Sequence, residues 1–171
     1  SDAGTALRYD VAKGQWLIDP EGLVARNDVL YTTPSAEPWE AMPTGGGDLS
    51  AMVRWDGSLH VHLTKSDAWG FQAPPDALLG ARVFNNVSPG HVRIDFGQRG
   101  RQAAARAFAQ RLDLYHGRVV VQLDGERGLR LAVWGHPQRK VLVIEVSDPA
   151  AVLGEATVEL SHWRSTVQVS S

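Results

Sequence analysis

The chain has 171 residues, of which 43% are hydrophobic and 21% are charged, with a formal net charge of −2 and no cysteine. This balance is typical of a globular domain with its own core and gives no reason to expect a nucleic-acid or anionic-membrane partner. The lack of cysteine excludes disulfides, thiolate zinc sites and cysteine nucleophiles. No apolar run reaches the length of a membrane span, so we expect no membrane-spanning helix.

The first 26 residues show no regular pattern, so we divide the chain into an irregular N-terminal segment, 1–26, and a domain over 27–171. Within the domain, short segments alternate apolar and polar residues with the period of two that half-buried strands show. Two others are nearly all apolar, as strands buried on both faces would be. Turn signals separate the segments, and together they predict an all-β fold, an antiparallel two-sheet β-sandwich. The alternating segments are 49–53, 59–63, 92–96 and 129–133, and the apolar ones are 119–123 and 141–146.

The Asp-Gly pair between the first two alternating segments predicts a hairpin. A three-residue loop over 55–57 places Val53 opposite Leu59, whereas a two-residue turn places Val53 opposite His60. Only the first pairing keeps the apolar residues of both strands on one face. We therefore predict the three-residue loop, with Gly57 at positive φ.

Residues 102–117 carry two conflicting signals. Their alanine run favours a helix, which leaves 103–107 open between helix and strand. Alternation resumes over 108–115, where we predict a strand.

Three consecutive glycines, 45–47, are followed by Asp48 and a predicted strand. A phosphate loop requires Gly-x-x-x-x-Gly-Lys-Ser/Thr between a strand and a helix, and a dinucleotide fingerprint also requires a following helix. Neither arrangement occurs here. The triplet is therefore either a tight approach into a strand or a loop kept small so that something packs against its backbone.

His60 and His62 share one face of a predicted strand, as two metal ligands could. A catalytic metal site needs a third ligand, and we identify no histidine or acidic partner at strand spacing. We therefore expect polar-face histidines, no metal and no cofactor. Nothing pairs any two carboxylates as a glycosidase requires, and no serine elbow occurs, so we predict no catalytic residues in this chain.

The stretch WEAMPTGGGDLSAMVRWDGSLHVHLTKSDAWG (39–70) resembles the opening of the N-terminal domain of α-L-fucosidase-type glycoside hydrolases, and most closely an uncharacterised sister group. The shared motifs are a Met-Pro-x-Gly-Gly-Gly-Asp loop at 42–48 and a Lys-x-Asp-Ala-Trp segment at 65–69. A second stretch, 110–146, resembles the family's Leu-Asp-Leu strand and the strands after it. Together the two stretches cover about two-fifths of the chain.

The resemblance implies a β-supersandwich that precedes a helical barrel, and it places the catalytic carboxylates in that barrel. We therefore expect a non-catalytic N-terminal domain, a fragment of a longer glycoside hydrolase-like parent, that supports the C-terminal barrel and lines its carbohydrate site. With this resemblance we also expect a bacterial protein that is secreted, periplasmic or located at the cell surface. The alternative is an independent carbohydrate-binding module with Trp39, Trp55 or Trp69 as its sugar platform.

The hairpin pairing also predicts where the site lies. Residues before Leu49 and after Leu63 leave the sheet at the same end, so the glycine triplet should lie near the segment that follows the second strand. That end would face the barrel or a sugar, unless Trp69 fills the core and the aspartates only cap turns. The candidate residues are Gly45, Gly46, Gly47, Asp48, Lys65, Asp67 and Trp69.

Overall fold

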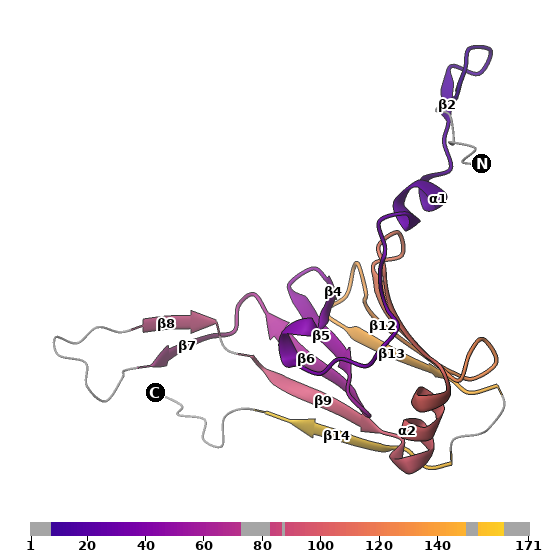
Figure 1. The fold of residues 1–171 in the computed structure, drawn as a ribbon. Helices are drawn as coiled ribbons and strands as arrows, with labels where there is room; N and C mark the ends of the chain where they lie inside the picture. Colours follow the sequence, from indigo (N-terminus) through magenta and orange to yellow (C-terminus); the bar gives the residue numbers. More distant parts are fainter. Residues whose placement is uncertain (1–7, 73–82, 87, 150–153, 163–171) are drawn as a thin grey trace.

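A computed structural model describes residues 8–72, 83–86, 88–149 and 154–162. Two antiparallel five-stranded sheets make up most of it, which confirms the predicted β-sandwich (Figure 1). Sheet I has the strand order β13-β12-β11-β10-β3, and sheet II has the order β14-β9-β6-β5-β4. Two further antiparallel pairs, β1-β2 and β7-β8, lie outside these sheets.

Sheet I is built from β3 (Val29–Tyr31), β10 (Phe108–Asp113), β11 (Arg118–Leu123), β12 (Leu129–Gly135) and β13 (Leu142–Ser147). Sheet II is built from β4 (Met42–Gly46), β5 (Leu49–Trp55), β6 (Leu59–Lys65), β9 (Gly90–Asp95) and β14 (Thr157–Ser161). The other elements are β1 (Arg8–Asp10), β2 (Gln15–Leu17), α1 (Pro20–Ala25), the 3₁₀ turn η1 (Pro38–Glu40), β7 (Trp69–Gln72), β8 (Val83–Asn86) and α2 (Gly97–Arg106). No helix in the described part of the chain combines the length and apolar character needed to cross a bilayer.

The hydrophobic core lies between the two sheets and follows the predicted alternation. Burying one large apolar side chain in this core stabilises the fold by roughly 1.5–3 kcal/mol, before the loss of conformational entropy is counted. Gln110 is also buried there, and its Nε2 donates to the carbonyl oxygen of Val53 at 3.3 Å, which joins sheet I to sheet II. Among the described residues, the largest fully buried apolar side chains are Val53, Trp55, Leu59, Val61, Val119, Val121, Leu123, Leu131 and Val133.

Helix α2 connects sheet II to sheet I and contributes Ala103 to the core. Residues 103–106, which the sequence left open between helix and strand, are its last turn, and Ala107 ends it with extended backbone. Phe96 precedes the helix and stacks on Trp55, with ring centroids 6.2 Å apart. The alanine run therefore serves as a helix because tertiary packing against this end of the core supports its high helix propensity.

The β5–β6 hairpin has the predicted loop length, but the predicted register is wrong. The loop consists of residues 56–58, so Trp55 pairs with Leu59 and Val53 with Val61. Trp55 belongs to the strand because its side chain is 0% exposed and lies in the core. The shift moves each partner by two residues, which keeps every side chain on its predicted face. Gly57 has a φ of +115°, and its predicted positive φ is confirmed.

Three other expectations differ from the structure. Residues 141–146 do not form a strand buried on both faces: β13 is an edge strand, and its last three residues are exposed. Strand β10 ends at Asp113, two residues before the predicted end, because the chain turns over 114–117. Residues 8–25 are not irregular, since they form the β1-β2 hairpin and α1.

Several connections gather at one end of the sandwich, which we call the turn end. It comprises the turns at 47–48, 114–117 and 136–141. Residues 8–28, which we call the arm, enter sheet I at this end, because Val29 pairs with Leu112 near the end of β10. The β7-β8 pair leaves sheet II at the same end, after β6 and before β9. Figure 1 shows the arm and the β7-β8 pair diverging from the sandwich in different directions.

Candidate functional site

The glycine triplet is the end of one strand and the start of a turn, rather than a separate loop. Gly45 and Gly46 pair with Ser50 and Leu49 as the last residues of β4. Gly47 opens the two-residue turn to β5 with a φ of +66°, a conformation that glycine adopts without strain.

The triplet also permits a close approach of two backbones, but both belong to this chain. A Cβ atom on Gly46 would lie 2.6 Å from the carbonyl oxygen of His136. A Cβ atom on Gly135 would lie 2.1 Å from the nitrogen of Gly46. The end of β4 therefore packs directly against the end of β12, and no barrel or sugar is needed to explain why glycine occupies position 46.

The predicted charged residues do come together at the turn end. Lys65 forms ion pairs with Asp67 and with Asp48, the latter at 3.4 Å between Nζ and Oδ2. Lys140 reaches the same oxygen of Asp48 at 3.0 Å. The hydrogen bond from Lys140, together with the charge of Lys65, holds the pKa of Asp48 below its usual range, and Lys65 does the same for Asp67. Lys140 was not among the residues predicted from the sequence.

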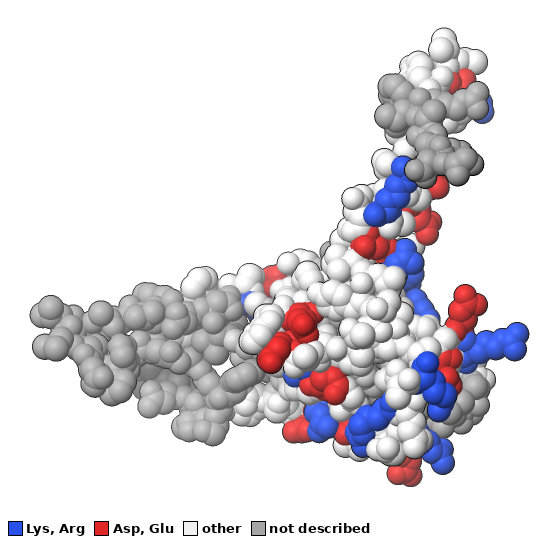
Figure 2. Space-filling model, viewed as in Figure 1, with Lys and Arg blue, Asp and Glu red and all other residues white. Residues whose placement is uncertain are grey.

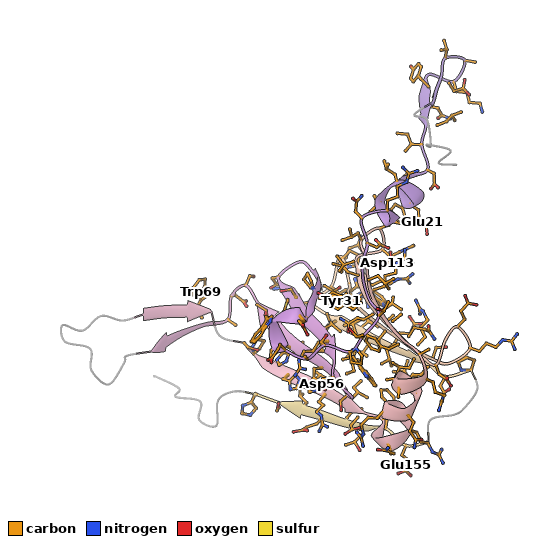
Figure 3. All side chains as sticks on the ribbon, viewed as in Figure 1. Glu21, Tyr31, Asp56, Trp69, Asp113 and Glu155 are labelled. Atoms are coloured by element: carbon orange, nitrogen blue, oxygen red, sulfur yellow. The ribbon has the colours of Figure 1, made fainter. Side chains whose placement is uncertain are left out.

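Trp69 does not fill the core, since 60% of its surface is exposed. It opens β7, and Figure 3 shows its side chain on the β7-β8 extension, away from the space between the sheets. Of the other two predicted platforms, Trp39 is 78% exposed and Trp55 is buried, which excludes Trp55 from surface binding.

A hollow of about 330 Å³ lies at the turn end between the β4-β5 turn and the chain that joins β12 to β13. Three of the predicted residues line it, namely Gly46, Gly47 and Asp48, together with residues 136–140. Sequence reasoning missed the second group because nothing in the pattern of residues 136–140 links them to a glycine pair 90 positions earlier. A second, larger hollow, of about 490 Å³, lies beside α2 and the 56–58 loop, and of the predicted residues only the buried Trp55 borders it.

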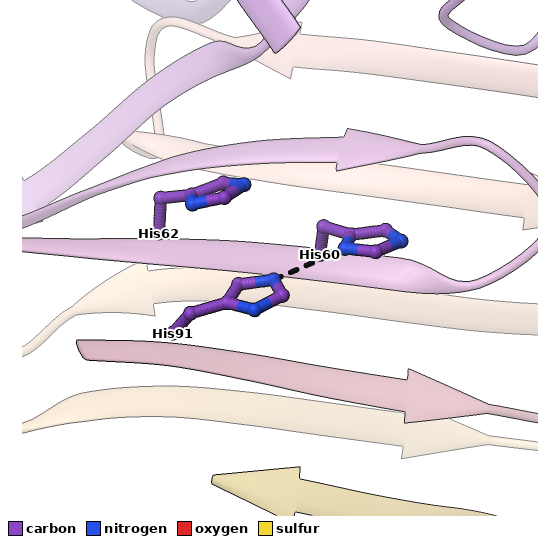
Figure 4. Close-up of side chains that lie close together, drawn as sticks. All are labelled: His60, His62 and His91. Carbon is purple, nitrogen blue, oxygen red and sulfur yellow. Dashed lines mark hydrogen bonds between the residues drawn. The ribbon is translucent and has the colours of Figure 1, made fainter. Parts of the chain in front are cut away.

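Three histidines cluster on the outer face of sheet II. His62 lies directly opposite His91 on β9, and His60 is two residues along β6 from His62 (Figure 4). His60 Nδ1 lies 3.0 Å from His91 Nε2, within hydrogen-bond distance. The rings of His62 and His91 are nearly parallel, with centroids 4.3 Å apart. One ring nitrogen of each residue lies within 4.8 Å of the others.

Charged neighbours surround this cluster. His60 Nε2 is 2.8 Å from Asp56 Oδ1, and Asp56 also pairs with Arg54. Burial lowers the pKa of each of the three histidines, and the positive charge of Arg54 lowers all three further. The imidazoles are therefore held neutral near pH 7, with Asp56 opposing the shift at His60.

The sequence pattern indicated His60 and His62 but not His91. The pairing of β6 with β9 supplies the missing third histidine, and 28 residues lie between His62 and His91, including the β7-β8 pair. A predicted strand began one residue after His91. The available signal was therefore that His91 precedes Val92, whose side chain faces the core, so that alternation places His91 on the outer face of the sheet. Only the strand order could show that the two strands are neighbours.

Acidic and basic side chains are interspersed on the face of the sandwich seen in Figure 2, and neither sign forms a continuous field.

A family model described as "Domain of unknown function (DUF5703)", DUF5703_N, matches residues 30–171. No curated protein and no solved structure matches the chain.

Proposed function

The chain belongs to the DUF5703_N family, and we propose that it is a non-catalytic β-sandwich domain of a secreted glycoside hydrolase-like protein. In this proposal the domain supports a C-terminal helical barrel of the same parent chain, and its turn end lines the carbohydrate site of that barrel. The resemblance of residues 39–70 to fucosidase-type proteins suggests the barrel as the partner.

The observation that carries the proposal is that two extensions leave the sandwich at the same end and expose apolar side chains. Helix α1 in the arm spans six residues and buries none of them, so packing against the sandwich covers little of it. Short helices are marginal in water without such packing, which favours a partner that covers the arm. The exposed large apolar side chains of the arm are Tyr9, Val11, Leu17, Ile18 and Leu23.

The turn end also exposes apolar side chains, next to those of the arm. Leu114 and Tyr115, in the turn between β10 and β11, are 42% and 45% exposed. The backbone nitrogen of Leu114 donates to Asp28 at the base of the arm, at 3.0 Å. A partner seated between the arm and the β7-β8 pair would therefore contact this turn and the hollow at Asp48 as well.

The carboxyl groups support a non-catalytic role. A glycosidase general acid needs a raised pKa so that it carries a proton at neutral pH. Among the described residues, every aspartate with a displaced pKa has that pKa lowered, as at Asp48 and Asp67 beside Lys65. These carboxylates accept hydrogen bonds and can orient sugar hydroxyls, but they do not hold a proton for transfer.

An independent carbohydrate-binding module is the second candidate, and the exposure of Trp39 and Trp69 favours it. Flat aromatic faces that reach solvent suit the apolar faces of sugar rings. The two candidates differ in what the isolated chain binds: a module binds oligosaccharide alone, whereas a supporting domain binds only with its barrel.

The decisive experiment uses the full parent protein. Leu17→Glu with Leu23→Glu should weaken the association of sandwich and barrel, seen as separate melting transitions and a loss of glycosidase activity. Val158→Glu with Leu160→Glu is the matched control, because these side chains are 65% and 74% exposed on edge strand β14, outside the arm. If the arm variant behaves like the control, the arm does not dock and the proposal fails.

Carbohydrate contact is tested separately with Trp69→Ala. In the parent this change should raise the KM for oligosaccharide while the melting temperature of the isolated chain stays unchanged, because the ring is exposed. Saturable binding of oligosaccharide by the isolated chain, abolished by Trp69→Ala, would instead establish the binding module.

A further inference from the structure

We propose that His60, His62 and His91 bind one divalent transition-metal ion of the zinc class on the outer face of sheet II. This inference is independent of the proposed carbohydrate role, since the cluster lies on the open face of the sheet. One nitrogen from each ring already lies within 4.8 Å of the other two. Imidazole nitrogen is a preferred ligand of Zn²⁺, Cu²⁺ and Ni²⁺.

The hydrogen bonds of His60 prepare one of its nitrogens as a ligand. Its Nε2 donates to Asp56 Oδ1 at 2.8 Å, which leaves the lone pair on Nδ1 directed towards His91. Metal-binding histidines commonly donate their second ring N–H to a carboxylate, which fixes the tautomer and the ring orientation. Asp56 is itself held by Arg54, so the carboxylate that orients His60 is fixed in turn.

His62 supplies a second, independent observation. Its Nε2 is buried and has no hydrogen-bond partner in the structure. An unpaired buried polar atom costs roughly 1–3 kcal/mol, so such atoms are normally satisfied. A metal ion between His62 and its two neighbours would satisfy this nitrogen.

The spacing is close to what an ion requires. Zinc–nitrogen bonds of about 2.0–2.1 Å in a tetrahedral site place the ligand nitrogens roughly 3.3 Å from one another. His60 Nδ1 and His91 Nε2 are 3.0 Å apart, and an ion would replace the proton that they share. The three rings are nearly parallel, so His62 and His91 must rotate about their Cβ–Cγ bonds, a torsion with broad minima.

The neighbours of the cluster leave a place for the ion. Across the strands, His62 and His91 are flanked by Met52 on β5 and Ser161 on β14, which carry no charge. The two nearby arginines each pair with an aspartate, Arg54 with Asp56 and Arg93 with Asp95, although the charge of Arg54 still lowers the pKa of all three histidines. Three histidines and an open fourth position, filled by water, match the donor set of an open zinc site.

The test is a titration of the whole chain with Co²⁺ and then Zn²⁺. We expect the visible absorption of four-coordinate Co²⁺ to saturate at one ion per chain and to disappear when Zn²⁺ displaces it. His62→Gln and His91→Gln should each abolish the Co²⁺ spectrum, while His136→Gln, in the turn that follows β12 of sheet I, should leave it unchanged. Circular dichroism establishes that each variant is folded.

Asp56→Asn tests the role of the carboxylate. It should keep one Zn²⁺ per chain but weaken its affinity by about 10–100-fold, the usual effect of removing an outer partner of a metal-bound histidine. An unchanged affinity would show that Asp56 does not orient His60. The metal site as a whole is refuted if the wild-type chain shows no saturable binding, or if folded His62→Gln and His91→Gln bind Zn²⁺ as the wild type does. The cluster would then be a hydrogen-bonded group of neutral histidines.

Discussion

The backbones of Gly46 and Gly135 lie so close together that a Cβ atom on Gly135 would be 2.1 Å from the nitrogen of Gly46. The contact joins the end of β4 in sheet II to the end of β12 in sheet I. It accounts for glycine at both positions, because real Cβ atoms essentially never come this close to another heavy atom.

The Gly46 contact predicts a loss of stability when a side chain is added. Gly46→Ala should lower the free energy of unfolding by about 1–3 kcal/mol, because the new Cβ meets the fixed carbonyl of His136. Urea unfolding measures this change. Gly47→Asn is the control, since position 47 has open space and asparagine tolerates its positive φ. Equal effects of the two substitutions would show that crowding at Gly46 is not the cause.

The Gly57 conformation predicts a different kind of loss. Gly57→Val should destabilise the chain by about 1–3 kcal/mol, because a β-branched residue is strained at a φ of +115°. Space is not limiting, as a Cβ there would lie 3.6 Å from the side chain of Arg101. Gly154→Val, at an exposed glycine without a positive φ, should leave the melting temperature nearly unchanged. An unaltered melting temperature for Gly57→Val would contradict the loop conformation.

Asp113 predicts a dependence of stability on pH. Burial alone would raise its pKa, but the hydrogen bonds from His116 and Arg118 outweigh it and hold the pKa below 3.8. A lowered folded-state pKa means that the carboxylate stabilises the fold above the unfolded-state value and that this stability is lost as the pH falls through the folded-state value.

Asp113→Asn should therefore cost about 1–3 kcal/mol at neutral pH, and the difference from the wild type should shrink as the pH falls below the unfolded-state pKa of about 3.9. Urea unfolding across this range measures it. Asp124→Asn removes an exposed carboxylate that pairs with Arg106 and should cost less. A difference for Asp113→Asn that stays constant with pH would show that its charge is not involved.

The sequence pairs no two carboxylates as a glycosidase requires, so we predict that this chain alone hydrolyses no aryl glycoside. The assay compares release of nitrophenol from a panel of aryl glycosides, including α-L-fucoside, with a buffer blank. Turnover above the blank that is abolished by a single Asp or Glu substitution within residues 1–171 would overturn this expectation.

The sequence by itself determined the fold class, because apolar and polar residues alternate along each strand whichever strands are its neighbours in the sheet. The same alternation identified the buried face of β5 and β6 correctly, although the register was two residues off. The loop 55–57 was wrong for a physical reason: burial of Trp55 extends the strand by one residue, and neither the Asp-Gly signal nor the alternation can weigh that burial.

Only the tertiary structure decided what the candidate residues contact. The approach of Gly46 to Gly135, the reach of Lys140 to Asp48 and the pairing of His62 with His91 all join segments that are distant in sequence. Each of these contacts depends on which strands are neighbours and on how the two sheets stack. Neither can be predicted from the pattern of residues within one segment. The sequence therefore showed which side chains reach the surface of the sheet, while the strand order determined which of them meet.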